Sequence, residues 1–99
     1  MSVELPERDG DGYLVSMDDW TPEIGRAMAE ADGIELDDEK WEQIMQAREY
    51  YEQENVVPAI RIFAKHIKRD KKDLFKLWAT GPMKPITKYG GLPKPTGCV

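Results

Sequence analysis

Apolar residues recur at helical spacing soon after the N-terminal segment. Four of them lie at i, i+3, i+4 and i+7, which places them on one face of a helix: Ile24, Ala27, Met28 and Ala31. Thr21 and Pro22 are typical of a helix start. Threonine caps the helix, and proline at the first helical position lacks only a backbone N–H that would have no partner within the helix. Gly33 favours a stop. The pattern predicts a first helix over residues 22–32.

A second and longer helix is predicted from Asp37 to about Asn55. Asp37 provides a cap, and the acidic residues after it suit the positive end of a helix dipole. Its apolar positions lie close to one face: Trp41, Ile44, Met45 and Tyr51, widened by Ala47 and Tyr50. Val56-Val57-Pro58 then interrupts the chain, and Pro58 can open the next helix.

The third predicted helix has two stripes. One is apolar and suits a core: Ile60, Phe63, Ala64 and Ile67. The other is basic: Arg61, Lys65, Lys68 and Arg69. Leu74, Leu77 and Trp78 mark a fourth, shorter helix that ends before Gly81-Pro82, and one short helical turn fits residues 83–89.

Two β-prone pieces precede the helices. Val3-Glu4-Leu5 and Tyr13-Leu14-Val15 flank Asp9-Gly10-Asp11-Gly12, a strong turn signal. We therefore expect a mainly α fold, with a small N-terminal β-hairpin packed on a bundle of four to five helices.

The end of the chain is rich in proline and glycine, and it carries the only cysteine. Cys98 is next to last, behind Gly91-Leu92-Pro93-Lys94-Pro95-Thr96-Gly97. Chain ends fray unless something ties them down, so a buried inert cysteine is a poor interpretation. We expect a helical domain over residues 1–89 and a flexible arm over residues 90–99 that presents a thiol.

Composition and charge narrow the setting. The chain has 99 residues, 40% of them apolar, which predicts one folded domain. We expect its oligomeric state to be a monomer. No apolar run is long enough to span a membrane, and a single free thiol favours the cytoplasm. Residues 1–60 hold 17 acidic against 4 basic residues, whereas residues 61–99 hold 2 against 10. This dipolar pattern steers acidic partners toward the basic half, although oppositely charged helix faces packed together also explain it.

The residues exclude several kinds of chemistry. One cysteine and one histidine cannot form a zinc site within the chain, and no phosphate-binding glycine motif is present. His66 is a candidate base for Cys98, but a half-solvated surface histidine is the more ordinary interpretation. An exposed thiol suits sulfur exchange, whereas no held base or oxyanion stabiliser is evident. The pattern predicts a carrier rather than an autonomous enzyme, with no metal and no cofactor.

Several motifs together resemble the DsrC/TusE family of sulfur-relay proteins over nearly the whole chain. They are Asp11-Gly12-Tyr13-Leu14, Trp41, Pro58-Ala59-Ile60-Arg61, Gly81-Pro82 with Lys84, Thr87 and Lys88, and the ending Gly91-Leu92-Pro93-Lys94-Pro95 with Cys98. The resemblance implies that Cys98 takes up sulfane sulfur as a covalent persulfide and passes it on. The implied donor is a relay complex of the TusBCD or DsrEFH type.

The resemblance covers two branches with different acceptors. In the TusE branch the sulfur moves toward an enzyme that thiolates tRNA, so that tRNA is contacted only through a partner. In the DsrC branch the protein serves dissimilatory sulfite reductase and uses a second cysteine, eleven positions before the terminal one. Thr87 stands at that position here. A single-cysteine carrier of the TusE type therefore fits better, in tRNA thiolation or in a sulfur-oxidation relay.

Four basic residues are further candidates, for stabilising the anionic sulfur or docking an acidic partner: Arg61, Lys84, Lys88 and Lys94. Ordinary surface charge is the alternative. A helix-turn-helix nucleic-acid module is a rival function, since the second and third helices meet near Pro58 and the third is basic. A purely structural subunit is another.

Overall fold

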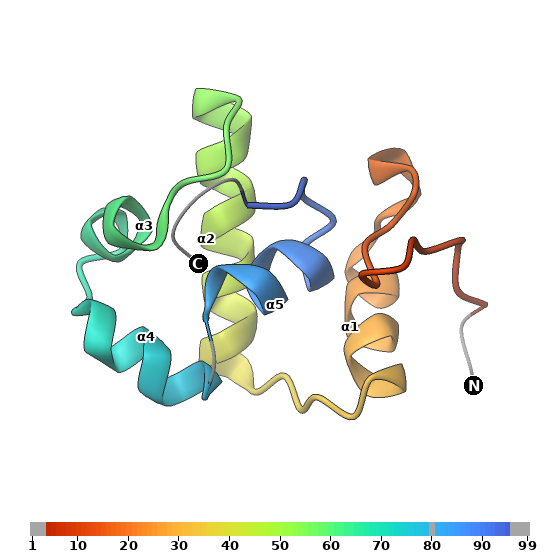
Figure 1. Ribbon diagram of the computed structural model, residues 1–99, viewed down its shortest axis with the longest axis horizontal. Coiled ribbons are helices and arrows are strands. Elements are labelled where there is room, and N and C mark those ends of the chain that lie inside the picture. Colours follow the sequence, from red (N-terminus) through yellow and green to blue (C-terminus); the bar gives the residue numbers. More distant parts are fainter. Residues whose placement is uncertain (1–3, 80, 96–99) are drawn as a thin grey trace.

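The computed structural model describes residues 4–79 and 81–95 and is built from helices (Figure 1). A 3-10 turn, η1 (Met17–Asp19), precedes five α-helices. They are α1 (Pro22–Ala31), α2 (Asp38–Glu54), α3 (Ile60–His66), α4 (Lys71–Trp78) and α5 (Met83–Tyr89). The mainly helical prediction is confirmed, and η1 is an element that the sequence pattern did not indicate.

Three of the helices start at capping side chains. Thr21 accepts a hydrogen bond from the N–H of Ile24 at the start of α1, and Asp37 and Asp70 cap α2 and α4 in the same way. Helix α3 begins at Ile60, two residues later than Pro58. The residue before Ile60 has extended backbone angles and no side chain that can cap.

Helix α5 lies in the middle of the molecule and packs against both α1 and α2, while α3 packs against α4 (Figure 1). Its inward side chains Met83 and Ile86 are fully buried. They join one continuous core with side chains from the other helices, among them Met28, Ile44, Phe63 and Leu74. Because these side chains anchor α5 in the core, the helix fixes the point from which the following chain departs.

The predicted N-terminal β-hairpin is wrong. Within residues 4–79 and 81–95 no strand forms, and the pairing is reduced to one isolated antiparallel bridge between Arg8 and Leu14. The Asp9 carboxylate accepts the N–H groups of Asp11 and Tyr13, which closes the turn locally. A two-stranded ribbon without a third strand is marginal, and Val15 remains 62% exposed.

The N-terminal segment is held to the helices by side chains instead. Arg8 donates two hydrogen bonds to the Asp32 carboxylate, at 2.9 and 3.1 Å, and Tyr89 donates its hydroxyl to the same group at 2.8 Å. The bond from Arg8 holds the pKa of Asp32 below its ordinary value. Burial and the neighbouring carboxylate raise the pKa of Tyr89.

None of the described helices is long and apolar enough to cross a membrane.

Candidate functional site

The chain leaving α5 is clamped to the body of the protein. Trp20 donates its indole N–H to the carbonyl of Tyr89 at 2.8 Å, and Arg48 donates to the carbonyl of Gly90. The N–H of Leu92 donates to the carbonyl of Thr87 at 3.0 Å, and the Leu92 side chain is buried in the core. The first three residues of the predicted arm are therefore packed, and the chain emerges from a defined point after Leu92.

The clamp depends on close backbone approach. Gly91 has a φ of +66°, and an added Cβ there would overlap the Cβ, Cγ and Cδ1 of Trp20. The Arg48 guanidinium lies 3.8 Å from the centre of the Trp20 ring, which stacks on Trp41 at 6.3 Å. The Arg26 guanidinium lies 4.2 Å from the centre of the Trp41 ring. This ladder joins α1 and α2 beneath the start of the arm.

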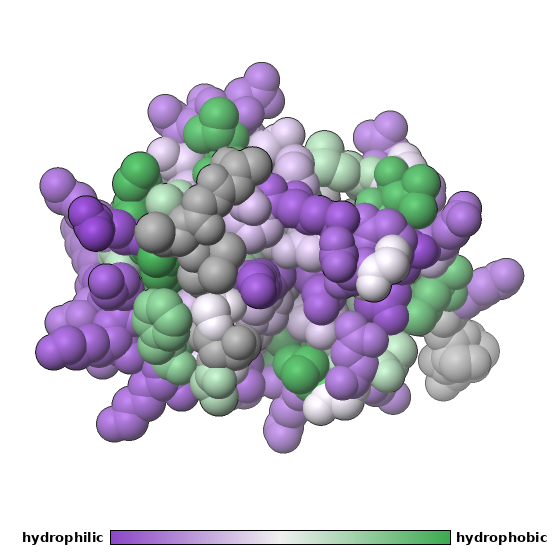
Figure 2. All heavy atoms as spheres, in the orientation of Figure 1, coloured by the Kyte–Doolittle hydropathy of each residue, from purple (hydrophilic) through white to green (hydrophobic). Residues whose placement is uncertain are grey.

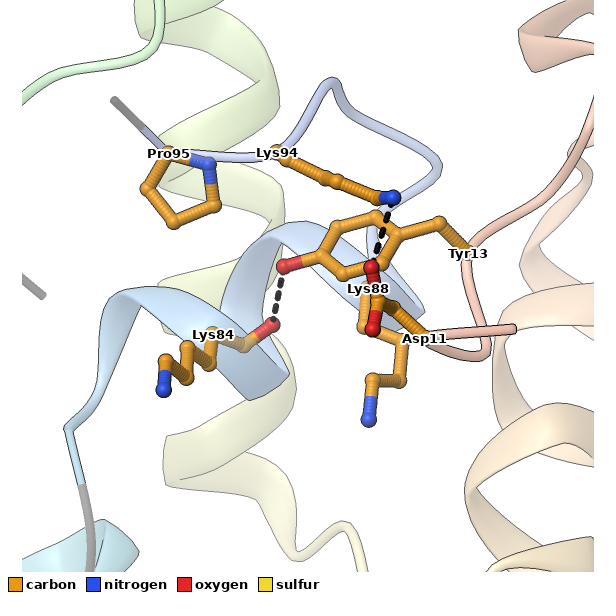
Figure 3. Close-up of a pocket in the computed structure, with 6 residues that line it drawn as sticks. All are labelled: Asp11, Tyr13, Lys84, Lys88, Lys94 and Pro95. Carbon is orange, nitrogen blue, oxygen red and sulfur yellow. Dashed lines mark hydrogen bonds and ion pairs between the residues drawn. The ribbon is translucent and has the colours of Figure 1, made fainter. Parts of the chain in front are cut away.

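A pocket of about 420 Å³ lies beside the emerging arm (Figure 3). Six residues line it: Asp11, Tyr13, Lys84, Lys88, Lys94 and Pro95. The N-terminal turn, α5 and the arm each contribute to its wall. In Figure 3 the Lys84 and Lys88 side chains extend from α5 away from Lys94, which lies over the Tyr13 ring.

Tyr13 connects the N-terminal turn to α5. Its hydroxyl oxygen lies 2.8 Å from the Thr87 Oγ1 and 3.2 Å from the carbonyl oxygen of Lys84. Thr87 is fully buried, and its hydroxyl donates to the carbonyl of Met83 at 2.6 Å, so that it accepts from Tyr13. Burial raises the pKa of the Tyr13 hydroxyl. Residue 87 thus lies beneath Tyr13, held by hydrogen bonds on two sides.

Lys94 is engaged by two carboxylates of the N-terminal turn. Its ammonium lies 2.7 Å from Asp11 and 3.1 Å from Asp9. The hydrogen bonds to Asp11 and Asp9 raise the pKa of Lys94. Desolvation raises the pKa of Asp9, but the hydrogen bonds from Lys94 and from backbone N–H groups outweigh it, so the pKa of Asp9 is lowered. Lys94 therefore ties the arm to the turn, and its charge is compensated.

Lys84 and Lys88 differ from Lys94 in their ion pairing. Within the part of the chain that the structure describes, neither lysine forms an ion pair. Lys84 is exposed and Lys88 half-buried, and both come from the same helix face at i and i+4. The pocket thus presents two ammonium groups that form no ion pair among the described residues, which suits an anionic ligand or an anionic sulfur.

The predicted site residues are partly brought together. Lys84, Lys88 and Lys94 line one pocket, whereas Arg61 is exposed on α3 and is not among its lining residues. Cys98 lies outside the described residues. His66 is exposed and meets the Tyr50 ring edge-on, at 5.2 Å between ring centres.

Four residues of the site did not emerge from sequence reasoning as site residues: Asp9, Asp11, Tyr13 and Thr87. The sequence pattern places Asp9 and Asp11 in a turn signal and Tyr13 in a β-prone piece. Their roles depend on contacts with residues more than 70 positions away, for which a single sequence holds no local signal. No group of three or more metal-ligating side chains suited to a metal ion occurs among the described residues.

The comparisons with known proteins cover nearly the whole chain. A family model described as "DsrC like protein" matches residues 2–99. A sulfurtransferase TusE homolog of Haemophilus influenzae is 39% identical, covering 94% of this chain and 92% of the relative. The dissimilatory-type sulfite reductase subunit gamma of Nitratidesulfovibrio vulgaris is 37% identical, with 94% and 90% covered. The solution structure of Allochromatium vinosum DsrC superposes with a TM-score of 0.81 at 40% identity, covering 93% and 88% of the two chains.

Proposed function

The chain belongs to the DsrC-like protein family, and we propose that it is a sulfur carrier in a relay between other proteins. Cys98 accepts sulfane sulfur as a persulfide and hands it to a downstream acceptor. Relatives named as TusE sulfurtransferases and as a sulfite reductase subunit support this role. The carrier acts with partners and is not an autonomous catalyst.

The transfer step is a thiol–persulfide exchange. The Cys98 thiolate attacks the outer sulfur of a donor persulfide, and a new S–S bond forms to Cys98. The donor's own S–S bond breaks, and its electron pair stays on the donor sulfur, which leaves as a thiolate. The proton of the donor persulfide moves with the outer sulfur, so no external oxidant or reductant is needed. A downstream thiolate repeats the step and regenerates Cys98.

The observation that carries the proposal is the clamped arm beside the lysine pocket. Pro95 lines the pocket, and Cys98 follows three residues later, a reach of up to roughly 10 Å. Lys84 and Lys88 supply the positive charge that favours a thiolate or persulfide anion. Lys94 directs the arm by its bonds to the turn. Arg61 is proposed as a partner contact, outside the pocket.

The single cysteine favours the TusE type of relay. Thr87 has no sulfur, and its hydroxyl is buried in bonds to Tyr13 and Met83. An intramolecular link between positions 87 and 98 through sulfur is therefore unavailable to this chain. We propose a donor of the TusBCD or DsrEFH type and an acceptor such as a tRNA thiolase. Service to sulfite reductase is the alternative acceptor, and sulfur oxidation the alternative pathway.

Two further parts of the proposal follow from the same chemistry. The persulfide is a covalent modification of Cys98, so the carrier uses no separate cofactor. The single thiol stays free for exchange in a reducing compartment, which agrees with a place in the cytoplasm. We keep a helical body and a thiol-bearing arm as the proposed division of labour, but residues 90–92 of the predicted arm over residues 90–99 are packed on the body, so the arm itself starts after Leu92.

Intact-mass measurement after incubation with a persulfidated donor tests the proposal. We expect the full-length chain to gain the mass of one sulfur atom, to lose it on reduction, and to gain none in Cys98→Ser. A thiol that stays unmodified by every persulfide donor offered overturns the carrier role. A pathway that runs unchanged with Cys98→Ser identifies a structural subunit instead.

A further inference from the structure

The segment over residues 60–78, which contains α3, α4 and the link between them, holds half of the lysines and arginines of the chain. Between residues 60 and 78, seven side chains are basic and two are acidic. All seven are exposed: Arg61, Lys65, Lys68, Arg69, Lys71, Lys72 and Lys76. We use the name α3–α4 surface for these seven residues together with Ile62 and Phe75.

Little of this charge is compensated within the molecule. Arg69 pairs with Glu39 of α2 at 2.9 Å, and no other ion pair involves the surface among residues 4–79 and 81–95. The Asp70 carboxylate accepts the backbone N–H of Lys72 and so caps α4. Among the described residues, six ammonium or guanidinium groups are thus left without an ion pair, five on the two helices and one, Lys68, in the link between them.

Two large apolar side chains are exposed among these charges. Ile62 is 52% exposed on α3, and Phe75 is 41% exposed on α4. Neither is needed for the core, because Phe63 and Leu74 beside them are fully buried. Figure 2 shows apolar and strongly hydrophilic side chains intermixed over α3 and α4. Covering apolar side chains of this size with a partner is favourable.

The surface is held rigidly on the body. Trp78, near the end of α4, donates its indole N–H to the buried Gln43 side chain of α2 at 2.9 Å. Lys40 lies 5.5 Å from the centre of the same ring, and α3 packs directly against α4. A surface whose helices are already fixed loses little conformational entropy on binding.

We propose that the α3–α4 surface docks an acidic protein surface that also carries apolar groups, presented by the sulfur donor. This inference rests on the proposed carrier function, because a relay must select its donor before the thiol reacts. Unpaired charges of one sign raise the rate of encounter with an oppositely charged partner. The exposed apolar side chains then lengthen the contact once it has formed.

A protein fits this surface better than a nucleic acid does. Residues 60–78 contain no Asn, Gln, Ser or Thr, so the amide and hydroxyl groups that read base edges are absent. The first residue of α3, Ile60, is buried in the core and cannot enter a groove. Exposed Ile62 and Phe75 gain nothing from phosphates but do gain from an apolar protein contact.

Sulfur transfer from two donors separates docking from chemistry. Full-length protein is loaded either with inorganic polysulfide or with a persulfidated complex of the TusBCD type, and the rate is followed by intact mass. We expect Lys65→Ala with Lys72→Ala to slow loading from the protein donor about tenfold at low salt, and less at high salt. Loading from polysulfide stays unchanged. Phe75→Ser slows the protein donor at both salt concentrations.

Matched controls change the net charge, or remove an exposed apolar side chain, at positions outside the α3–α4 surface. Ser16→Asp with Gln53→Glu lowers the net charge by the same two units on exposed positions outside the surface. Val56→Ser removes an exposed apolar side chain that is not part of it. Both controls should load from the protein donor at the unmodified rate.

The outcomes are distinguishable. If no donor loads the unmodified protein, the proposed function itself fails. If both donors load it and the α3–α4 variants match the controls, only the docking surface is overturned. A loss of tRNA or duplex binding in the variants, with loading unaffected, reassigns the surface to nucleic acid. A loss of self-association in sedimentation, again with loading unaffected, reassigns it to a second copy of the chain.

Discussion

The indole N–H of Trp20 donates to the carbonyl of Tyr89 at 2.8 Å, and this bond joins the entry to α1 to the last residue of α5. The carbonyl belongs to the helix end from which the thiol-bearing arm departs. Arg48 holds the next carbonyl and stacks on the same indole. One tryptophan therefore couples α1, α2 and the base of the arm.

Replacing this tryptophan tests the clamp. Trp20→Phe removes the donor and leaves the Tyr89 carbonyl short of a partner, so we expect a loss of about 1–3 kcal/mol in the free energy of unfolding. Trp41→Phe is the matched control, because Trp41 is also half-buried and its indole donates to no described residue. Urea unfolding of both variants measures the difference. Equal losses would show that the hydrogen bond contributes nothing beyond ring packing.

The glycine at the base of the arm should be intolerant of a side chain. Gly91→Ala adds a Cβ that overlaps Trp20 and places a non-glycine residue at a φ of +66°. Overpacking and the left-handed backbone together predict a loss of at least about 2 kcal/mol. Gly10→Ala is the control, since no atom lies within 4 Å of its added Cβ. Thermal unfolding that leaves both variants alike would contradict the close packing seen at Gly91.

Helix positions could be predicted because they depend on local patterns. The predicted first helix of residues 22–32 and the observed α1 differ at a single end residue, since Thr21, Pro22 and Gly33 are local signals. The short helical turn over residues 83–89 is α5. In each case the capping groups and the apolar stripe lie within one or two turns of each other.

The site depends on contacts that a local pattern does not contain. The turn at Asp9 has the composition of a hairpin, yet its carboxylate closes the turn and accepts from Lys94, 85 positions away. Gly90 and Gly91 belong to a segment whose composition predicts an arm, but Trp20 packs against Gly91, and Ile44 of α2 lies against Gly90. Only the folded structure brings these groups together, so the pocket could not be assembled from spacing alone.

The tether between Lys94 and the N-terminal turn should depend on pH. In the folded protein the pKa of Asp9 is lowered and that of Lys94 is raised. The Asp9 contribution to stability is therefore present above its unfolded pKa of about 3.9 and is lost as the pH falls through the folded value. The Lys94 contribution is present below about 10.4 and is lost as the pH rises through its raised value. Because both side chains are exposed, the contribution is small.

Carboxyl titration by NMR measures this tether. We expect Lys94→Met to raise the pKa of Asp9, because the ammonium is lost while the desolvation that opposes ionisation remains. Lys76→Met, which removes an exposed lysine from α4, should leave the titration of Asp9 unchanged. A midpoint for Asp9 that is the same in both variants would show that Lys94 does not hold the turn in solution.

The last prediction concerns the effect of the pocket lysines Lys84 and Lys88 on the reactivity of the Cys98 thiol. If the arm brings Cys98 near Lys84 and Lys88, their charges stabilise its thiolate, and Lys84→Gln with Lys88→Gln raises the pKa of the thiol. At separations of about 8 Å in a largely aqueous setting, two such charges shift a pKa by about half a unit. The rate of alkylation by iodoacetamide at neutral pH then falls about two- to threefold, and salt reduces the difference. Lys65→Gln with Lys72→Gln alters the net charge equally on α3 and α4 and should leave the rate unchanged. An equal fall in both pairs would mean that the thiol senses only the total charge of the protein, and that the pocket is not where its reactivity is set.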